Sequence, residues 1–133
     1  MIAVDTNILV RYVTNDDPHQ ARQALKLLGS KETIFVAKTV LLETAWVLRA
    51  VYELPDASVE RALLQVLGLP NVVVEDPSEV AQALGYYGSG MNFADALHLA
   101  SSCDAETFFT LDKAVVKSGQ ACGARIEMVA GEK

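Results

Sequence analysis

The sequence predicts an α/β fold in which short parallel strands alternate with helices. Two observations support this prediction. Apolar, β-branched segments of about three to five residues recur along the chain, and longer amphipathic segments with helix caps and glycine ends lie between them. Such buried strands are typical of a parallel sheet with helices on both faces, and ligands of these folds bind beyond the carboxyl ends of the strands. At 133 residues, the chain is expected to form one domain over residues 1–133.

The first part of the chain is expected to contain three strands and four helices. Asp17 followed by Pro18 is a strong helix start, and Gly29 and Gly68 are expected to end helices. Thr39 and Asp56 are the expected caps of two further helices. The expected elements are the strand Ile2–Val4, the helices Thr6–Val13 and Pro18–Leu28, the strand Thr33–Ala37, the helices Lys38–Tyr52 and Asp56–Leu67, and the strand Asn71–Glu75.

The second part continues the alternation after Pro77. Three glycines within GYYGSGMN predict a turn-rich loop at residues 85–92. The expected elements around it are the helix Pro77–Leu84, the helix Asn92–Ser102, the strand Thr107–Leu111, the helix Asp112–Ser118 and the strand Ile126–Val129.

The charge balance narrows the function classes. Seventeen acidic residues against eleven Lys and Arg give a formal net charge of −6, which argues against a general nucleic-acid coat protein with a basic surface. A nuclease remains compatible, because cations held by clustered acids reduce the negative charge that a phosphate meets. The mean hydropathy of +0.23 is high for a soluble chain and predicts self-association or another partner on apolar surface.

The same composition suggests a location in the cytoplasm without membrane association. No apolar stretch reaches the roughly 18 to 20 residues of a membrane span, and no basic leader precedes the first apolar residues. Cys103 and Cys122 have neither CxxC nor zinc-site spacing and are expected to be reduced packing residues.

Two aspartates occupy equivalent junctions between a strand and a helix. Asp5 follows IAV and precedes TNIL, while Asp112 follows FFTL and precedes KAVV, so both are expected at the carboxyl edge of the sheet. Each could simply cap its helix. Asp5 could equally face a water-filled cleft or bind a cation, because a carboxylate in an apolar segment needs compensation.

Glu43 has less structural justification than the two aspartates. Its helical neighbours Val40, Trp46 and Val47 are apolar, and no basic residue lies three or four positions further along. A glutamate on an apolar helix face is seldom buried unless something binds it, which favours a functional role.

Asp95 lies three residues after Asn92, and two interpretations remain open. The pair could form a capping box, or the helix N-terminus could keep Asp95 ionised and ready to bind a metal ion. His98 follows one turn later and is better explained by hydrogen bonding than by metal ligation.

Four carboxylates without an accompanying set of His or Cys indicate Mg²⁺ or Mn²⁺. Such a site suits hydrolysis of phosphodiester bonds, because a bound ion activates water and stabilises charge on the phosphate. Thr6, Asn7 and Thr110 could orient a water at the same edge. The basic residues considered for phosphate contacts, which the sequence does not rank, are Arg11, Lys38, Lys113 and Lys117.

Taken together, the segments DTNILVRY, LLETAWVL, NFADALHLA and TLDKA resemble the PIN-domain ribonucleases, particularly the VapC toxins of bacterial and archaeal toxin–antitoxin pairs. The resemblance covers nearly the whole chain. It implies a parallel five-stranded sheet in the order 3-2-1-4-5, with Asp5, Glu43, Asp95 and Asp112 as the catalytic, metal-binding acids. Many relatives carry an acid where this chain has Asn92, so Asn92 is assigned only a supporting role.

The resemblance also implies function and partners. It implies a Mg²⁺- or Mn²⁺-dependent endoribonuclease that acts as the toxin of a type II toxin–antitoxin system, cuts a structured RNA such as tRNA or rRNA, and forms a homodimer. A VapB-like antitoxin would cover the site with its C-terminal segment.

Two other functions are compatible with parts of this pattern. A catalytically silent PIN-like interaction module is the alternative outside the enzymes, and the presence of all four acids argues against it. A phosphotransfer protein also places Asp at strand ends, but residue 7 is Asn, so the DxDxT motif of such enzymes is absent.

Overall fold

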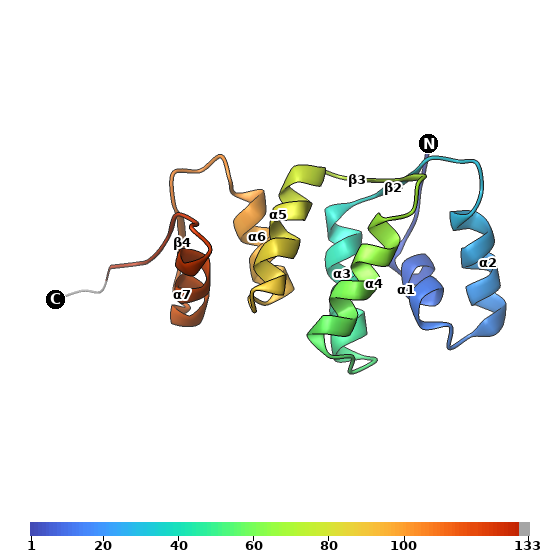
Figure 1. Ribbon diagram of the computed structural model, residues 1–133, viewed down its shortest axis with the longest axis horizontal. Helices are drawn as coiled ribbons and strands as arrows, with labels where there is room; N and C mark the ends of the chain where they lie inside the picture. Colours follow the sequence, from blue (N-terminus) through green and yellow to red (C-terminus); the bar gives the residue numbers. More distant parts are fainter. Residues whose placement is uncertain (131–133) are drawn as a thin grey trace. The chain divides into compact units, whose positions relative to one another are not determined.

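The computed structural model describes residues 1–130, which divide into unit 1, Met1–Pro77, and unit 2, which begins at Ser78. Both units are built from helices and short parallel strands, so the α/β class is confirmed (Figure 1). The prediction of one domain over residues 1–133 stays a prediction, and its last three residues lie outside the described ones.

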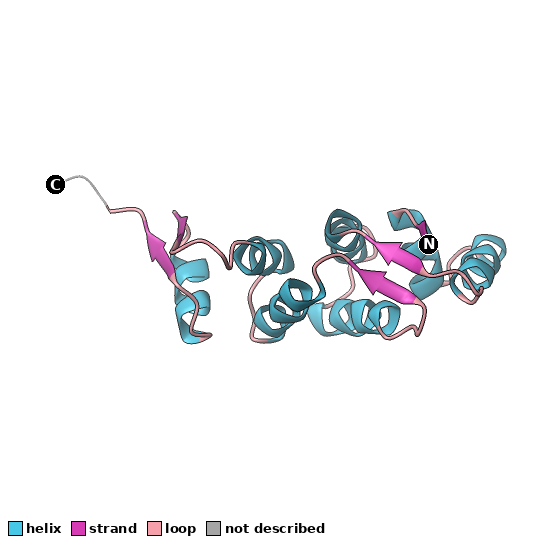
Figure 2. Ribbon diagram, turned by 90° about the horizontal axis from the view of Figure 1, so that it is seen from above, coloured by secondary structure: helices cyan, strands magenta, loops and turns pink. Residues whose placement is uncertain are grey.

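Unit 1 contains a three-stranded parallel sheet in the order β1-β2-β3. Ile2 lies opposite Ile34, and Phe35 lies opposite Val73. Figure 2 shows helices on both sides of the two longer strands. The elements are β1 (Ile2–Ala3), α1 (Thr6–Thr14), α2 (Pro18–Leu28), β2 (Ile34–Val36), α3 (Lys38–Ala50), α4 (Asp56–Leu67) and β3 (Val72–Val74).

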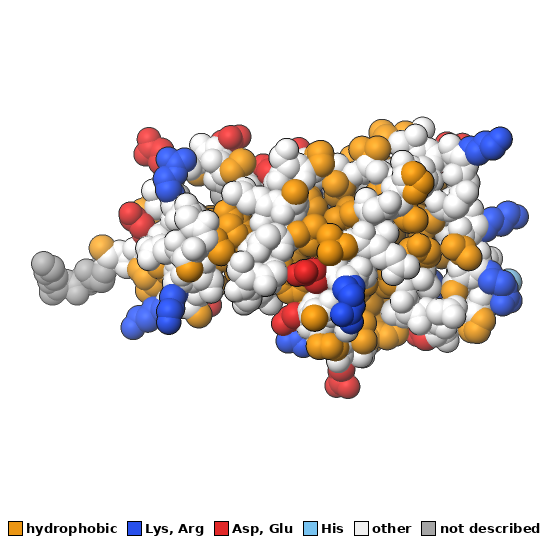
Figure 3. Space-filling model, in the orientation of Figure 1, with side chains coloured by type: hydrophobic (Ala, Val, Ile, Leu, Met, Phe, Trp, Pro, Cys, Tyr) orange, Lys and Arg blue, Asp and Glu red, His pale blue; other side chains and the backbone are white. Residues whose placement is uncertain are grey.

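The core of unit 1 is aliphatic and comes from the sheet and the inner faces of its helices. Its fully buried side chains, which include Leu9, Leu28, Ile34, Val36, Leu41, Leu48, Val59 and Leu63, have relative exposures below 2 %. Some apolar side chains of unit 1 also lie on the surface, as Figure 3 shows over its helices.

Several helix ends in unit 1 agree with the local sequence. The Asp17 carboxylate caps α2 by accepting a hydrogen bond of 3.1 Å from the Gln20 N–H, and Pro18 is the first helical residue. Gly29 and Gly68 end α2 and α4. These features need only neighbouring residues, which is why the sequence predicted them.

Two predicted caps in unit 1 are wrong. Helix α3 begins after Ala37 rather than being capped by Thr39, and its first N–H, that of Lys38, donates to the Glu75 carboxylate over 2.9 Å. Helix α4 begins after Pro55, and Asp56 instead forms an ion pair with Arg49 at 3.0 Å. The Glu75 cap comes from the segment after β3, so the sequence around α3 does not contain the signal.

Unit 2 contains a two-stranded parallel sheet with Phe108 opposite Ile126 and Thr110 opposite Met128. Parallel strands need a long crossover, and here a helix makes it. The elements are α5 (Pro77–Gly88), which starts at the boundary with unit 1, α6 (Phe93–Ser101), β4 (Phe108–Thr110), α7 (Lys113–Ala121) and β5 (Ile126–Met128).

The expectation of one five-stranded sheet in the order 3-2-1-4-5 is wrong for this structure. The expected neighbours within residues 2–74 and within residues 108–128 do pair, but the ladders form one sheet of three strands and one of two. Strand β1 has only two residues, which pair with β2, and β4 pairs with β5. Composition predicts which segments are extended, whereas pairing depends on backbone hydrogen bonds between distant segments.

The predicted loop at residues 85–92 is also partly wrong, because α5 continues to Gly88. Tyr86 and Tyr87 are buried, and the Tyr87 ring meets Phe93 edge-on with 5.3 Å between ring centroids. Burying two aromatic rings outweighs the cost of about 1 kcal/mol for each helical glycine. Helix α7 likewise runs past Ser118 to Ala121.

Within residues 1–130, every helix is too short or too polar to span a lipid bilayer.

Gly119 is required for packing in unit 2, and this can be tested against a second helical glycine. A Cβ at Gly119 would lie 2.7 Å from Cγ2 of Ile126, which is itself buried. Gly119→Ala should therefore destabilise the protein by about 1–3 kcal/mol, as overpacked cores do. Gly85→Ala, with no atom within 4 Å of its Cβ, should stabilise it by about 0.5–1 kcal/mol. Urea unfolding of both variants measures the difference, and a stabilising Gly119→Ala would contradict the packing.

Candidate functional site

Unit 1 contains a pocket of about 310 Å³ between α1 and α3. We call it the α1–α3 pocket. Asp5, two residues after the end of β1, lines the pocket. Asn7 and Arg11 share a face of α1 because they are four residues apart. The lining residues are Asp5, Thr6, Asn7, Val10, Arg11, Glu43, Val47, Val51 and Tyr52.

Asp5 and Glu43, two of the four acids singled out from the sequence, both line this pocket. The Asp5 carboxylate caps α1 by accepting a 2.7 Å hydrogen bond from the Thr6 N–H, so it both caps a helix and faces a cleft. Glu43 is exposed, and no described residue forms a hydrogen bond or ion pair with it. Both carboxylates are therefore available to a cation.

Thr6 gives an independent indication of a ligand. Its side chain is only 6 % exposed, and its Oγ1 has no hydrogen-bond partner among the described residues. A buried hydroxyl in this state costs about 1–3 kcal/mol, so a polar ligand in the pocket would recover that free energy.

The donors of the pocket fit a hard divalent cation. They are two carboxylates, the Thr6 hydroxyl and the Asn7 amide, and Mg²⁺ and Mn²⁺ prefer such oxygen ligands. Within either unit, the described residues form no group of three or more Asp, Glu, His or Cys able to hold a metal ion. The two acids of unit 1 therefore do not by themselves form a complete metal site.

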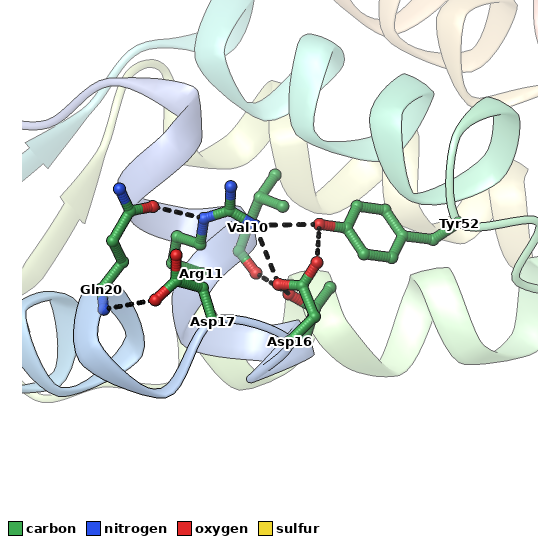
Figure 4. Close-up of polar contacts among 7 residues, drawn as sticks. Val10, Arg11, Asp16, Asp17, Gln20 and Tyr52 are labelled. Atoms are coloured by element: carbon green, nitrogen blue, oxygen red, sulfur yellow. Dashed lines mark hydrogen bonds and ion pairs between the residues drawn. The ribbon is translucent and has the colours of Figure 1, made fainter.

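Arg11 is held at the edge of the pocket by a polar network (Figure 4). Its Nε donates to Gln20 over 2.7 Å, and its Nη1 donates to Asp16 over 2.8 Å and to the Tyr52 hydroxyl over 3.2 Å. The Tyr52 hydroxyl donates to Asp16 over 2.7 Å, and Thr14 donates to the same carboxylate over 3.0 Å. The bond from Tyr52, aided by those from Thr14 and Arg11, lowers the pKa of Asp16, while the bond to Asp16 raises the pKa of Arg11.

In unit 2, Asp95 lies in the first turn of α6. The Asn92 side chain caps this helix by accepting hydrogen bonds from the Ala94 N–H at 2.9 Å and the Asp95 N–H at 3.4 Å. No described residue donates to the Asp95 carboxylate, so only half of the capping box forms and the half-buried acid is open to a ligand. His98 is exposed one turn later.

Asp112 caps α7 by accepting hydrogen bonds from the Ala114 N–H at 2.9 Å and the Val115 N–H at 3.3 Å. Thr110 Oγ1 accepts a 3.1 Å bond from the Asp112 N–H. Thr110 therefore positions the backbone of the acid, a role that the sequence analysis did not assign to it.

The predicted site residues thus fall into two groups. Asp5, Thr6, Asn7 and Glu43 share the α1–α3 pocket, whereas Asn92, Asp95, Thr110 and Asp112 lie in unit 2. The convergence of all four acids in one site stays a prediction. The partners of Arg11 could not be predicted from the sequence. The four-residue spacing between Asn7 and Arg11 indicates only that the two residues share a face of α1.

The cysteines of unit 2 differ from the prediction. Both are free, but they are exposed rather than packed, because they follow the ends of α6 and α7. They line a pocket of about 180 Å³ together with Tyr86 and Arg125. Burial raises the pKa of the Tyr86 hydroxyl there and, together with a 3.6 Å bond to Glu79, that of the Cys103 thiol.

The acids and their spacing can be compared with known proteins. A family model of the PIN domain matches residues 2–116, a range that includes all four acids. The chain belongs to the PIN-domain family. PIN domains are generally nucleases and typically use divalent metal ions. No curated protein matches the sequence of this PIN domain.

The network around Asp16 should make the stability of this PIN domain depend on pH. The lowered pKa of Asp16 means that the folded state favours its ionised form. The resulting stability is fully present above about pH 3.9, the ordinary aspartate value, and is lost as pH falls through the lower folded value.

Asp16→Asn should therefore have a lower melting temperature than the wild type near pH 7, and the difference should shrink as the pH falls below about 4. Thermal unfolding from pH 7 to pH 3 measures it. Asp104→Asn, which changes an exposed acid of unit 2, is the control. A difference for Asp16→Asn that is constant with pH would contradict the coupling.

Proposed function

We propose that this PIN domain is a Mg²⁺- or Mn²⁺-dependent endoribonuclease that hydrolyses RNA phosphodiester bonds and acts as the toxin of a type II toxin–antitoxin system. The observation that carries the proposal is the α1–α3 pocket. There, two carboxylates and a buried hydroxyl lie together, and within residues 1–130 the carboxylates have no cation bonded to them and the hydroxyl has no hydrogen-bond partner. The family supports it, because PIN domains are generally nucleases.

The pairing of two candidate basic residues of unit 1 supports this assignment. Lys38 forms an ion pair with Asp76 at 3.0 Å, and Arg11 forms one with Asp16 at 2.8 Å. Neither is bonded to Asp5 or Glu43, so the negative charge of these two acids can attract an added cation. A silent interaction module would gain nothing from gathering carboxylates in this way.

Each residue then has a role. Asp5, Glu43, Asp95 and Asp112 would hold Mg²⁺ or Mn²⁺, which when bound lowers the pKa of water and stabilises charge on the phosphate. The Thr6 hydroxyl and the Asn7 amide orient the attacking water or a phosphate oxygen. Asn92 and Thr110 hold the helix starts that carry Asp95 and Asp112.

The proposed partners follow from the surface beside the pocket. Trp46, one turn after Glu43 on α3, is 62 % exposed, and so is Val51, which lines the pocket. This surface suits a VapB-like antitoxin that sets apolar side chains on α3 and a Lys or Arg among the acids. We also propose a cytoplasmic homodimer, with structured tRNA or rRNA as the substrate.

The role of Glu43 can be tested by Glu43→Gln, which keeps the shape and removes the charge. We expect cleavage of total tRNA in Mn²⁺ to fall by about a hundredfold or more, because a carboxylate that holds the ion is lost. The rise in melting temperature on adding Mn²⁺ should also shrink. Glu32→Gln, an exposed acid outside the pocket, is the matched control.

Two outcomes would contradict the proposal. Equal cleavage by the wild type in EDTA would remove the metal-dependent mechanism. Unchanged cleavage and Mn²⁺ stabilisation in Glu43→Gln would assign Glu43 to the scaffold.

The antitoxin should compete with the metal ion, because its basic side chain and the ion would occupy the same carboxylates. The test partner is any short protein encoded immediately upstream of this gene. Its binding can be followed by the emission of Trp46, which is the only Trp of the chain. We expect the partner to bind more weakly in saturating Mn²⁺ than in EDTA. Equal affinities would show that the basic side chain of the partner does not occupy the carboxylates that hold the ion.

A further inference from the structure

We propose that Arg11 binds a phosphate of the RNA strand at the edge of the α1–α3 pocket. Asp16, Gln20 and Tyr52 act as positioning residues that hold the guanidinium there. This inference rests on the proposed nuclease function and extends it by naming a substrate-binding residue outside the acids.

The guanidinium is restrained on one side and available on the other. Its Nε is bonded to Gln20, and both protons of Nη1 have acceptors, the Asp16 carboxylate and the Tyr52 hydroxyl. Nη2 has no bond to any residue in the described part of the chain, and Figure 4 shows it without a dashed line. Two N–H donors therefore remain for a ligand.

Arg11 lines the same pocket as the two acids Asp5 and Glu43. Asn7 and Arg11 lie one helical turn apart on the face of α1 that lines the pocket. The Arg11 guanidinium is held at the end of α1 opposite Asp5, by Asp16 and Tyr52. Its side chain is 31 % exposed, so a ligand can reach it.

Charge decides which ligand this arrangement suits. The pocket combines two carboxylates that can attract a cation with a guanidinium that is not bonded to them. A molecule that bridges the cation and the guanidinium needs two oxygens that share negative charge. The two non-bridging oxygens of a phosphodiester meet this requirement. Arginine binds phosphate oxygens with directed donors, and its restraint by three side chains reduces the ordering cost on binding.

The structure also ranks the four basic residues considered for phosphate contacts. Lys38 is paired with Asp76 and does not line the pocket. Lys113 and Lys117 lie on α7 of unit 2, exposed and without a described partner that would orient them. Arg11 alone among these four both lines the α1–α3 pocket and is held in place.

The test uses the full chain and a short fluorescein-labelled RNA stem-loop. In EDTA, where the proposed nuclease does not cut, fluorescence anisotropy should show that Arg11→Gln raises the Kd about tenfold, the effect of losing one charge-assisted hydrogen bond. The slope of log K against log salt should fall by about 0.7–0.9. Arg11→Lys should retain the slope and only part of the affinity. Lysine keeps the positive charge but lacks the planar set of N–H donors of the guanidinium.

Two variants separate charge from position. Tyr52→Phe removes an acceptor of Arg11 and the bond to Asp16, so it should raise the Kd less than Arg11→Gln and leave the salt slope unchanged. Arg61→Gln is the matched control, because Arg61 bonds to Ser58 on α4 and does not line the pocket. It should leave both quantities unchanged. In Mn²⁺, Arg11→Gln should raise KM and leave kcat within about twofold.

The outcomes distinguish this inference from the proposed function. If the wild type cleaves RNA but Arg11→Gln binds as tightly as Arg61→Gln, the inference is overturned and the nuclease stands. If the wild type does not cleave but its RNA affinity depends on Arg11, the nuclease is overturned and the phosphate contact stands.

A measurement on the wild type guards against variants that fail to fold. The side-chain ¹⁵N resonances of Arg11 should shift when the stem-loop is added. No shift overturns the inference, and so does a shift with polyglutamate but not with RNA, because Arg11 would then select carboxylates.

Discussion

The hydrogen bond between the Asp5 carboxylate and the Thr6 N–H is the interaction on which the α1–α3 pocket depends. It starts α1 three residues after the end of β1, so the helix begins beyond the carboxyl end of the strand. That start places Thr6 and Asn7 on the pocket wall, and the helical repeat brings Arg11 to the same wall one turn later. A shift of the helix start by one residue would rotate α1 by about 100° and remove all three from the pocket.

Polar contacts between distant segments hold the other wall. The Glu75 carboxylate after β3 caps α3, the helix that carries Glu43. The Tyr52 hydroxyl, after the end of α3, bonds to Asp16 in the turn between α1 and α2. The Asn71 amide donates to three backbone carbonyls, those of Leu28, Ser30 and Glu32. The first two bonds tie α3 to the segment after β3 and to the turn after α1, so the relative positions of α1 and α3 do not depend on apolar packing alone.

Structural and functional roles are not exclusive for the acids of this PIN domain. Asp5 and Asp112 both cap helices, and each cap uses one carboxylate oxygen for backbone N–H groups. The other oxygen remains available to a ligand. Glu43 has no capping role, and the Asp95 carboxylate accepts no bond from the described residues, so these two acids are not explained by their local backbone. The strongest argument for function therefore comes from Glu43 and from the unpartnered Thr6 hydroxyl beside Asp5.

The sequence by itself determined the features that depend on a few neighbouring residues. The capping roles of Asp5, Asp17 and Asn92 and the ends of α2 and α4 could be predicted because a cap bonds to N–H groups one to three residues away. The alternation of strands and helices followed from the apolar pattern for the same reason. The four acids were found as a pattern along the chain, and the structure brings Asp5 and Glu43 into one pocket.

Only the tertiary structure decided what depends on distant partners. Strand pairing, the extension of α5 by the buried rings of Tyr86 and Tyr87, and the Glu75 cap of α3 could not be predicted, because each depends on contacts with residues far along the chain. The same reason separates Arg11 from Lys38. Both are single basic residues that lie five or six positions from a predicted acid in the sequence. Asp76 pairs with Lys38, whereas Asp16, Gln20 and Tyr52 hold Arg11 at the pocket.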